Sequence, residues 1–177
     1  MKSIFYFKSV MMMVVMAAFA ASMVSCGGND DDDVPGGDSM VGVHRIDIQF
    51  SENTLEWNRQ CSFYGYNPGG GYCTLYENGE VLTPKSGRTA WTTEDRRDVS
   101  VTSDNNTIAL TSSVVLIAPE GGAPADATVT VVGYVNNKRI STKSYTLPKG
   151  KRALSVSFAT ENGGKGAASI DGGEPFE

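Results

Sequence analysis

A histidine, the base that Ser-His-Asp and Cys-His mechanisms require, occurs once in this sequence, at position 44. His44 alternates in step with Ile46 and Ile48 at the start of a strand, which favours a hydrogen-bonded histidine at the edge of a sheet over a catalytic base. The sequence contains no Gly-x-Ser-x-Gly, His-Glu-x-x-His or Gly-x-x-x-x-Gly-Lys motif. We therefore expect no enzyme activity, no catalytic residues and no cofactor. A pair of carboxylates for glycoside hydrolysis is the catalytic alternative that stays open.

Thiol chemistry is the other kind that the sequence could support, through Cys26, Cys61 and Cys73. No Cys-x-x-Cys pair or Cys/His cluster is present, so we expect no metal site and no thiol redox activity. Cys61 and Cys73 form an even pair once Cys26 is set apart. In an exported protein such a pair suggests a disulfide, and two buried thiols are the alternative that the sequence leaves open.

Cys26 stands at the end of a short apolar segment. Lys2 and Lys8 precede the segment, and every residue from Val10 to Val24 is apolar or small. A helix of about 15 residues spans only roughly 22 Å, which is short of the ~30 Å hydrocarbon core of a bilayer. A basic flank, a short apolar region and small residues before a boundary predict a secretory signal peptide over residues 1–25.

The tetrad Met23-Val24-Ser25-Cys26, followed by Gly27-Gly28, resembles the lipobox of bacterial lipoproteins. The usual lipobox has leucine at its first position, where this chain has Met23. The resemblance implies that the Cys26 thiol carries a diacylglycerol and becomes the mature N-terminus. At about 0.8 kcal/mol per buried CH₂, two or three acyl chains would anchor the protein stably in a membrane.

An acidic segment follows the cysteine. It contains Asp30–Asp33 and then Pro35-Gly36-Gly37, and it has little apolar surface to bury. We expect residues 26–40 to be a lipidated, disordered linker that holds the domain clear of the lipid headgroups. An acidic run just after a lipidated cysteine also resembles the surface-export signal of Bacteroidota lipoproteins. That resemblance implies an outer-membrane location facing the cell exterior.

The net charge of −5 comes largely from this linker, which holds five acids, so it does not indicate a ligand. Nucleic acid is not an expected partner, because binding it requires a concentrated basic face. A run of basic residues between positions 138 and 152 contains no acid. It is either the polar side of a hairpin or a contact surface for anionic headgroups or glycans.

From Gly42 onward the hydrophobic pattern has a period of two, as in residues 44–50, and no helical period is convincing. Asn78-Gly79 is a strong hairpin signal and predicts that Tyr76 faces Val81 and that Leu75 faces Leu82. Eight or nine short strands predict a single antiparallel β-sandwich or small barrel over residues 41–160. The remaining residues, 161–177, are rich in glycine and are expected to form a flexible tail.

Tyrosines are the best candidates for a binding surface. If Cys61 and Phe63 face inward, Tyr64 and Tyr66 on the same strand face outward. After the glycine-rich turn, inward-facing Cys73 and Leu75 likewise put Tyr72 and Tyr76 on the outside. Such a platform would suit sugar rings or a protein partner, although outward tyrosines also stabilise sheets without any ligand.

Several segments together, among them "VHRIDIQFS", "LYENGEVL" and "ALSVSFAT", resemble the small β-barrel-fold surface lipoproteins of gut Bacteroidota. The resemblance implies an all-β fold and a surface address, and it brings no activity with it. The expected function is that of a lipid-anchored binding or accessory module for a glycan or a surface protein. The alternative is a structural or adhesin-like component of a surface complex.

Overall fold

A computed structural model describes residues 40–82, 88–92 and 98–177, with side chains described for 40–82 and 98–177. The predicted signal peptide, the predicted lipid-attachment site Cys26 and the acidic segment up to Ser39 lie outside the described residues. The chain from Ser39 to Glu177 forms one compact unit. None of the helices within the described residues is long and apolar enough to cross a bilayer.

The described chain consists of strands joined by turns and two short 3-10 helices, η1 (Glu52–Thr54) and η2 (Glu161–Gly163). The strands are β1 (His44–Phe50), β2 (Asn58–Tyr66), β3 (Leu75–Glu77), β4 (Glu80–Val81), β5 (Arg88–Thr92), β6 (Asp98–Ser103), β7 (Ala109–Ile117), β8 (Ala127–Val135), β9 (Lys138–Leu147), β10 (Ala153–Ala159) and β11 (Lys165–Ile170).

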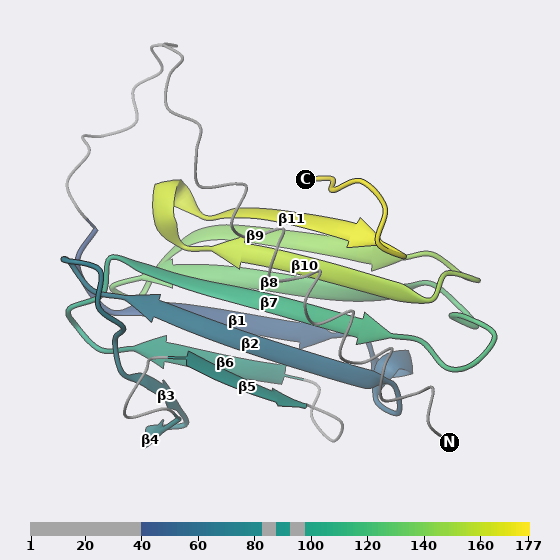
Figure 1. Cartoon of the computed structure of the whole chain (residues 1–177), viewed down its shortest axis with the longest axis horizontal. Coiled ribbons are helices and arrows are strands. Elements are labelled where there is room, and N and C mark those ends of the chain that lie inside the picture. Colours follow the sequence, from purple (N-terminus) through teal and green to yellow (C-terminus); the bar gives the residue numbers. More distant parts are fainter. Residues whose placement is uncertain (1–39, 83–87, 93–97) are drawn as a thin grey trace, which may run out of the picture. The chain divides into compact units, whose positions relative to one another are not determined.

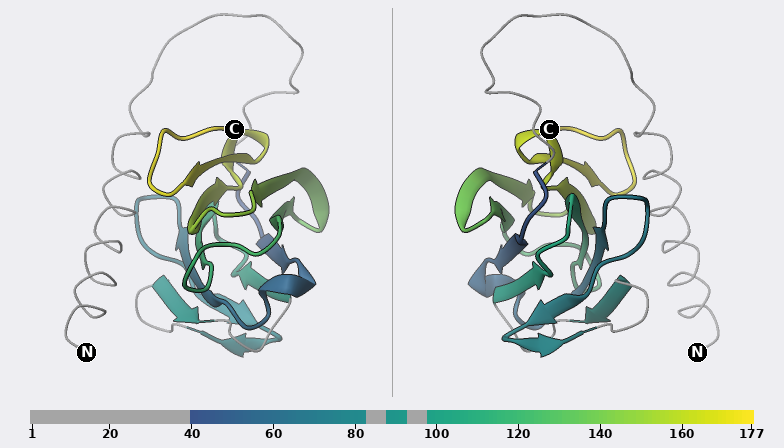
Figure 2. Two further views of the ribbon diagram at one scale, coloured as in Figure 1. Left: turned by 90° about the vertical axis from the view of Figure 1, so that its right-hand side faces the viewer. Right: turned by 90° about the vertical axis from the view of Figure 1, so that its left-hand side faces the viewer.

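The strands form two antiparallel sheets that pack face to face as a sandwich (Figures 1 and 2). The six-stranded sheet has the order β4-β3-β6-β1-β8-β9, and the five-stranded sheet has the order β11-β10-β7-β2-β5. The prediction of an all-β fold is confirmed, and of the two alternatives the sandwich is the one observed. The sheets do not close into a barrel, because each ends in two different edge strands.

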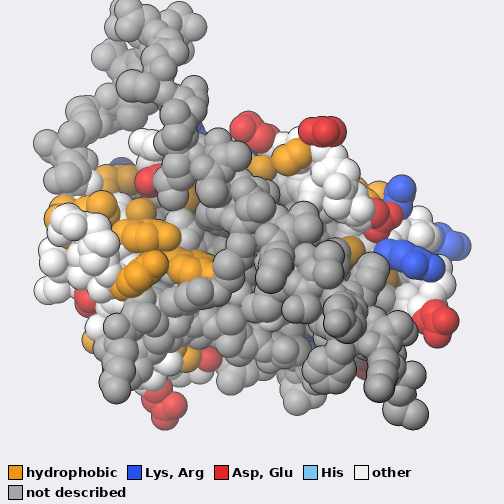
Figure 3. Space-filling model, in the orientation of Figure 1, with side chains coloured by type: hydrophobic (Ala, Val, Ile, Leu, Met, Phe, Trp, Pro, Cys, Tyr) orange, Lys and Arg blue, Asp and Glu red, His pale blue; other side chains and the backbone are white. Residues whose placement is uncertain are grey.

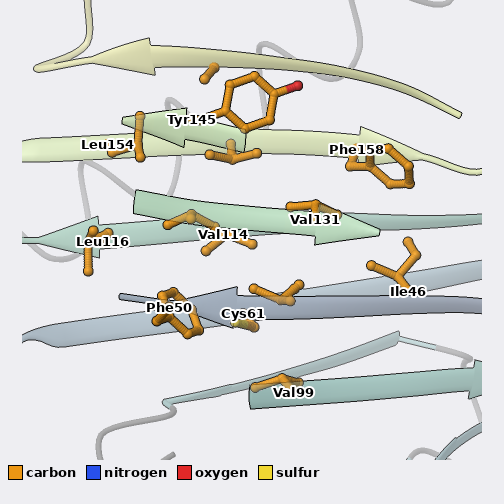
Figure 4. Packing of buried hydrophobic residues seen from close by; sticks show 14 of the residues in the cluster. Ile46, Phe50, Cys61, Val99, Val114, Leu116, Val131, Tyr145, Leu154 and Phe158 are labelled. Atoms are coloured by element: carbon orange, nitrogen blue, oxygen red, sulfur yellow. The ribbon is translucent and has the colours of Figure 1, made fainter. Parts of the chain in front are cut away.

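Alternation of side chains builds the core. In β1, Ile46, Ile48 and Phe50 are at most 1% exposed, while Arg45 and Asp47 point to the outer face. The facing sheet contributes inward residues from β2, β7 and β10, and Figure 4 shows Cys61, Val114 and Phe158 between the layers. Burying one face of each sheet supplies most of the favourable free energy of such a domain, at about 25 cal/mol per Å² of apolar surface.

The hairpin at Asn78-Gly79 has the predicted register. Tyr76 pairs with Val81, and the Leu82 amide donates to the Leu75 carbonyl at 2.8 Å. Asn78 has a φ of 52° and Gly79 a φ of 82°, the left-handed conformations that a tight two-residue turn requires.

The expectation of a flexible tail over residues 161–177 is wrong. Lys165–Ile170 forms β11, which pairs with β10 along its whole length, and Phe176 exchanges two backbone hydrogen bonds of 2.7 Å with Ala168. The sequence of β11 is rich in glycine, alanine and serine, which have weak strand preference. The strand forms because β10 offers an unpaired edge. The eleven strands exceed the predicted eight or nine partly for this reason, and partly because β5 was missed.

The two core cysteines lie too far apart to bridge. Cys73 packs against Gly65, and its amide donates to the Gly65 carbonyl at 3.0 Å. Cys61 lies four residues earlier on the same strand, about 13 Å from Gly65 along a strand. A disulfide needs Cα atoms roughly 4.4–6.8 Å apart, so the chain path opposes one. The structure has two buried thiols, which was the alternative to a disulfide.

We expect Gly65→Ala to lower the free energy of unfolding by about 1–3 kcal/mol, because overpacking in a well-packed core costs this much. A Cβ at Gly65 would lie 1.9 Å from the Cys73 Sγ and 3.1 Å from a methyl carbon of Leu75. Urea unfolding of the purified protein measures the change.

The matched control is Gly71→Ala, since a Cβ there meets nothing within 4 Å. It should change stability by less than about 0.5 kcal/mol. Adding Cys73→Ala to the Gly65→Ala variant should recover part of the loss. Equal stabilities for the two alanine variants would contradict this packing.

Candidate functional site

Three of the four predicted tyrosines come together at the end of β2. Tyr64 and Tyr66 are half-buried on the outer face of the five-stranded sheet, and Tyr72 is 52% exposed. Tyr66 and Tyr72 form an antiparallel bridge, and their ring centroids are 5.6 Å apart with planes tilted by 36°. We call Tyr64, Tyr66 and Tyr72 the tyrosine cluster.

Tyr76 does not belong to this cluster, and the expectation of a four-tyrosine platform is wrong in that respect. Tyr76 lies on β3, which pairs with β6 in the other sheet. The chain crosses between the sheets just before β3, where the Thr74 amide donates to the Asp104 carboxylate at 2.9 Å. Alternation along the chain predicted correctly that Tyr76 faces outward, but it faces outward from the opposite side of the sandwich.

The electrostatic surroundings of Tyr66 favour its neutral phenol. Partial burial raises the pKa of Tyr66 above its ordinary value, and the neighbouring Tyr72 and Tyr64 and the carboxylate of Glu161 raise it further. Tyr66 therefore stays protonated at neutral pH. Its hydroxyl can donate or accept a hydrogen bond beside an acid that can accept one.

A glycine-rich loop positions Tyr72. The Asn67 amide donates to the Gly71 carbonyl at 2.7 Å, and the Gly70 amide donates to the Asn67 carbonyl at 3.1 Å. Gly69 and Gly70 have φ values of 97° and 87°, which residues other than glycine rarely adopt. The Asn67 side chain also donates to the Tyr72 carbonyl at 3.3 Å. The loop thus returns the chain so that Tyr72 lies against Tyr66.

Figure 3 shows how side-chain types are distributed over one face of the molecule. Hydrophobic side chains, a group that includes tyrosine, gather at the left of the view, where β2 ends. Lysine and arginine side chains gather at the opposite end, where the chain passes from β9 to β10. The aromatic and basic features are therefore separate surfaces.

His44 is a structural residue with both ring nitrogens hydrogen-bonded. It is fully buried, and its Nε2 lies 2.7 Å from the carbonyl of Met40 while its Nδ1 lies 2.6 Å from the hydroxyl of Thr160. A carbonyl can only accept, so Nε2 carries the proton and the Thr160 hydroxyl donates to Nδ1. This agrees with the prediction of a satisfied histidine, although β1 is a central strand of its sheet.

Burial lowers the pKa of His44 below its ordinary value of 6.5, against the opposing effect of backbone groups of Met40 and Thr107. The imidazole is therefore neutral at physiological pH. A base that is buried and hydrogen-bonded at both nitrogens cannot reach a substrate without opening the fold.

Arg59 is a buried charge that sequence reasoning missed. It has no exposed surface, its guanidinium carbon lies 5.1 Å from the centre of the Phe50 ring, and its Nη2 donates to the Leu55 carbonyl at 3.1 Å. Arg59 is separated from Cys61 and Phe63 by even numbers of residues, and this alternation could have predicted that it faces inward. Its surroundings at the end of the core indicate a structural role.

The basic residues between positions 138 and 152 do not form one patch. Lys138 and Arg139 lie at the start of β9, whereas Lys149, Lys151 and Arg152 lie beyond its end. Ten residues of strand separate them by about 33 Å. Lys151 also pairs with Asp171 at 3.8 Å. The hairpin alternative therefore fits the structure better than a headgroup-binding surface.

The described residues contain no group of three His, Cys, Asp or Glu side chains that could hold a metal ion. The best-placed carboxylate, that of Asp104, is already used by the fold. Its Oδ1 accepts hydrogen bonds from Asn106 and Thr107, and its Oδ2 accepts one from Thr74. These bonds shape the turn between β6 and β7.

Comparison with solved structures relates this fold to proteins of Bacteroides. A crystal structure of a DUF4425 family protein from Bacteroides ovatus matches with a TM-score of 0.58 and 25% identity, covering 69% of this chain and 98% of that one. A domain of unknown function, DUF4425, from Bacteroides vulgatus matches with a TM-score of 0.55 and 22% identity, covering 75% of this chain and 98% of that one.

A third similar structure is the NMR structure of the calcium-bound form of a protein from Parabacteroides distasonis. It matches with a TM-score of 0.50 and 19% identity, covering 79% of this chain and 99% of that one. No protein-family model matches the chain, and no curated protein matches it in sequence. The comparisons therefore support the sandwich fold and bring no activity with them.

We expect acidification to destabilise the wild-type protein more than the His44→Gln variant. Because the pKa of His44 is depressed in the folded state, its stabilising contribution is complete above the unfolded pKa of 6.5 and is lost as pH falls towards the folded pKa. The slope for one proton is at most about 1.4 kcal/mol per pH unit. Urea unfolding at pH 7.5 and pH 5.5 measures both proteins, and identical pH dependence in the two would rule out this role.

Proposed function

We propose that this protein is a lipoprotein anchored in the outer membrane through Cys26, whose β-sandwich faces the cell exterior and acts as a non-catalytic binding module. The observation that carries the binding role is the convergence of Tyr64, Tyr66 and Tyr72 on one outer face. The proposed ligand of this cluster is a neutral glycan, with a surface protein as the second kind of partner.

The tether is supported by the sequence before the domain. A short apolar segment, the Met23-Val24-Ser25-Cys26 tetrad and the aspartates after it follow the order of a surface-lipoprotein leader.

The chemistry of the tyrosine cluster suits the face of a sugar ring. Aromatic rings offer a broad apolar surface that packs against the C–H groups of a sugar, while the hydroxyls remain available for hydrogen bonds. Tyr72 is the exposed member, and its ring lies beside that of Tyr66, with the ring centroids 5.6 Å apart. The nearby Glu161 carboxylate can accept a hydrogen bond from a sugar hydroxyl.

A non-catalytic role is supported by the state of the only histidine in the sequence. His44 is neutral, buried and hydrogen-bonded to Met40 and Thr160. A Ser-His-Asp or Cys-His mechanism would need this residue at a surface. Cys61 and Cys73 are likewise buried, and burial raises the pKa of Cys73, which opposes thiolate reactivity.

The structural alternative, assembly through sheet edges, is less well supported. Strand β9, an edge of the six-stranded sheet, carries Lys143 opposite the inward-facing Val131 and has a bulge opposite Gly133 and Tyr134. Both features oppose the addition of another strand. At the other edge β4 has only two residues, and the edge of β11 is partly paired by Phe176.

Calcium forms no part of this proposal. The similar Parabacteroides distasonis protein has a calcium-bound form. In this chain, the described residues provide no cluster of acidic ligands, and the Asp104 carboxylate is already hydrogen-bonded on both oxygens. The aspartates at positions 30–33 lie outside the described residues.

We expect Tyr72→Ser to weaken binding of a neutral oligosaccharide by several-fold to about tenfold, because removal of a stacked aromatic costs about 1 kcal/mol or more. The measurement is an array of immobilised neutral oligosaccharides probed with the labelled full chain, followed by titration of those that bind. Tyr66→Ser should have a similar effect.

Tyr76→Ser is the matched control, since this tyrosine lies on the other sheet and should leave neutral-glycan binding unchanged. Near-ultraviolet circular dichroism checks that each variant keeps its fold. If no neutral glycan binds, or if Tyr72→Ser and Tyr76→Ser behave alike, the cluster is not the glycan site. A cross-link from residue 72 to a cell-surface protein would then favour the second kind of partner.

We expect Cys26→Ser to abolish lipid attachment and the processing that depends on it. In the wild type, mass spectrometry should find a mature N-terminus at Cys26 with attached acyl chains, and protease added to intact cells should remove the domain. In the variant the protein should leave the membrane fraction or accumulate with residues 1–25 attached. A wild-type N-terminus elsewhere, or protection from protease, would argue against the anchor or its orientation respectively.

A further inference from the structure

The outer face of the six-stranded sheet carries a continuous row of side chains, one from each strand. Direct cross-strand pairs link neighbouring members of the row. In the order of the strands, the row consists of Val81, Tyr76, Thr102, Arg45, Tyr134 and Arg139. Neighbouring strands lie about 4.8 Å apart, so Tyr76 and Arg45 are roughly 10 Å apart.

Arg45, at the centre of this row, has an aromatic partner and an acidic partner. Its guanidinium lies 3.9 Å from the centre of the Tyr134 ring, and its Nε lies 3.2 Å from the Asp47 Oδ1. The same carboxylate oxygen accepts a hydrogen bond of 2.6 Å from Ser100, which fixes the acid in turn. Stacking and the ion pair therefore set both the plane and the direction of the guanidinium.

The terminal amino groups of Arg45 are left available. Over residues 40–82 and 98–177, the structure gives them neither a hydrogen bond nor an ion pair. A guanidinium that is ion-paired through Nε can still offer its two Nη groups, a planar pair of donors that matches a carboxylate. Holding the side chain in advance reduces the entropy lost on binding.

The charges around the fork favour an anion. Arg139 flanks Tyr134 on the side opposite Arg45, so two arginines border one ring. The nearest acid on this face is Asp47, which is engaged by Arg45 and Ser100, and Asp98 lies two rows further along β6. Tyr76 offers an aromatic surface two strands away from Arg45, and Thr102 lies between them.

We infer that this row binds an oligosaccharide that carries carboxylates, such as a uronate chain. The carboxylate of one sugar pairs with the Nη groups of Arg45, and the ring of another packs on Tyr76. Ser100 and Thr102 offer hydroxyls for hydrogen bonds to the sugar. The inference does not depend on the tyrosine cluster, which lies on the opposite sheet.

The test is calorimetric titration of the full chain in detergent micelles, with Tyr72→Ser introduced so that the tyrosine cluster does not bind the neutral probe. The probes are a short oligogalacturonate and its carboxyl-reduced, neutral counterpart. We expect the acidic probe to bind, more weakly at higher salt, and the neutral probe to bind at least about tenfold more weakly, since hydrogen bonds to charged groups contribute about 1.5–3 kcal/mol.

The decisive variant is Arg45→Lys, which keeps the charge and loses the fork. It should bind the acidic probe about tenfold more weakly, whereas the matched control Arg152→Lys at the far end of β9 should bind normally. Tyr76→Ser should weaken binding, and Tyr72→Ser should not. The last pair separates this site from the tyrosine cluster.

Several results would overturn the inference. They are no binding of oligogalacturonate, equal binding of the neutral probe, or equal affinities for Arg45→Lys and Arg152→Lys. Tighter binding of a sulfated oligosaccharide than of the uronate would also overturn the inference, because the site would then prefer a sulfate group to a planar carboxylate. If Arg45→Lys does not fold, unchanged binding by Tyr76→Ser overturns it.

Discussion

Burial of one face of each sheet against the other is the constraint on which the rest of this structure depends. Because side chains alternate along a strand, every residue placed in the core commits its neighbours to the outside. The burial of Ile46 and Ile48 in β1 puts Arg45 and Asp47 on an open face. In β2, the burial of Phe63 puts Tyr64 outside. The candidate binding residues are thus consequences of core packing.

The same burial determines which polar residues cannot act on a ligand. His44 lies on the inward side of β1, so it is neutral and satisfied by Met40 and Thr160. Arg59 lies on the inward side of β2 and packs against Phe50. His44 and Arg59 are therefore inside, whereas Arg45 and the four tyrosines face outward.

The two outer faces differ in character because different elements supply them. On the five-stranded sheet, a glycine-rich loop folds Tyr72 against Tyr66 to make an aromatic surface beside an acid. On the six-stranded sheet, Arg45 stacks on Tyr134 in a polar row. The neutral ligand that we propose belongs to the first surface, and the anionic ligand that we infer belongs to the second. The two proposals therefore concern opposite faces of one sandwich.

The sequence by itself determined the all-β class, the Asn78-Gly79 hairpin and the outward direction of all four tyrosines, because these depend on local turn chemistry and a period of two. Only the tertiary structure decided which sheet each strand joined. Tyr66 and Tyr76 both face outward, yet the chain crosses between the sheets after Cys73 and places them on opposite sides. Strand β11 and the separation of Cys61 from Cys73 also depend on which strands pair. Hydrophobic alternation within a strand does not indicate which distant strand it will pair with.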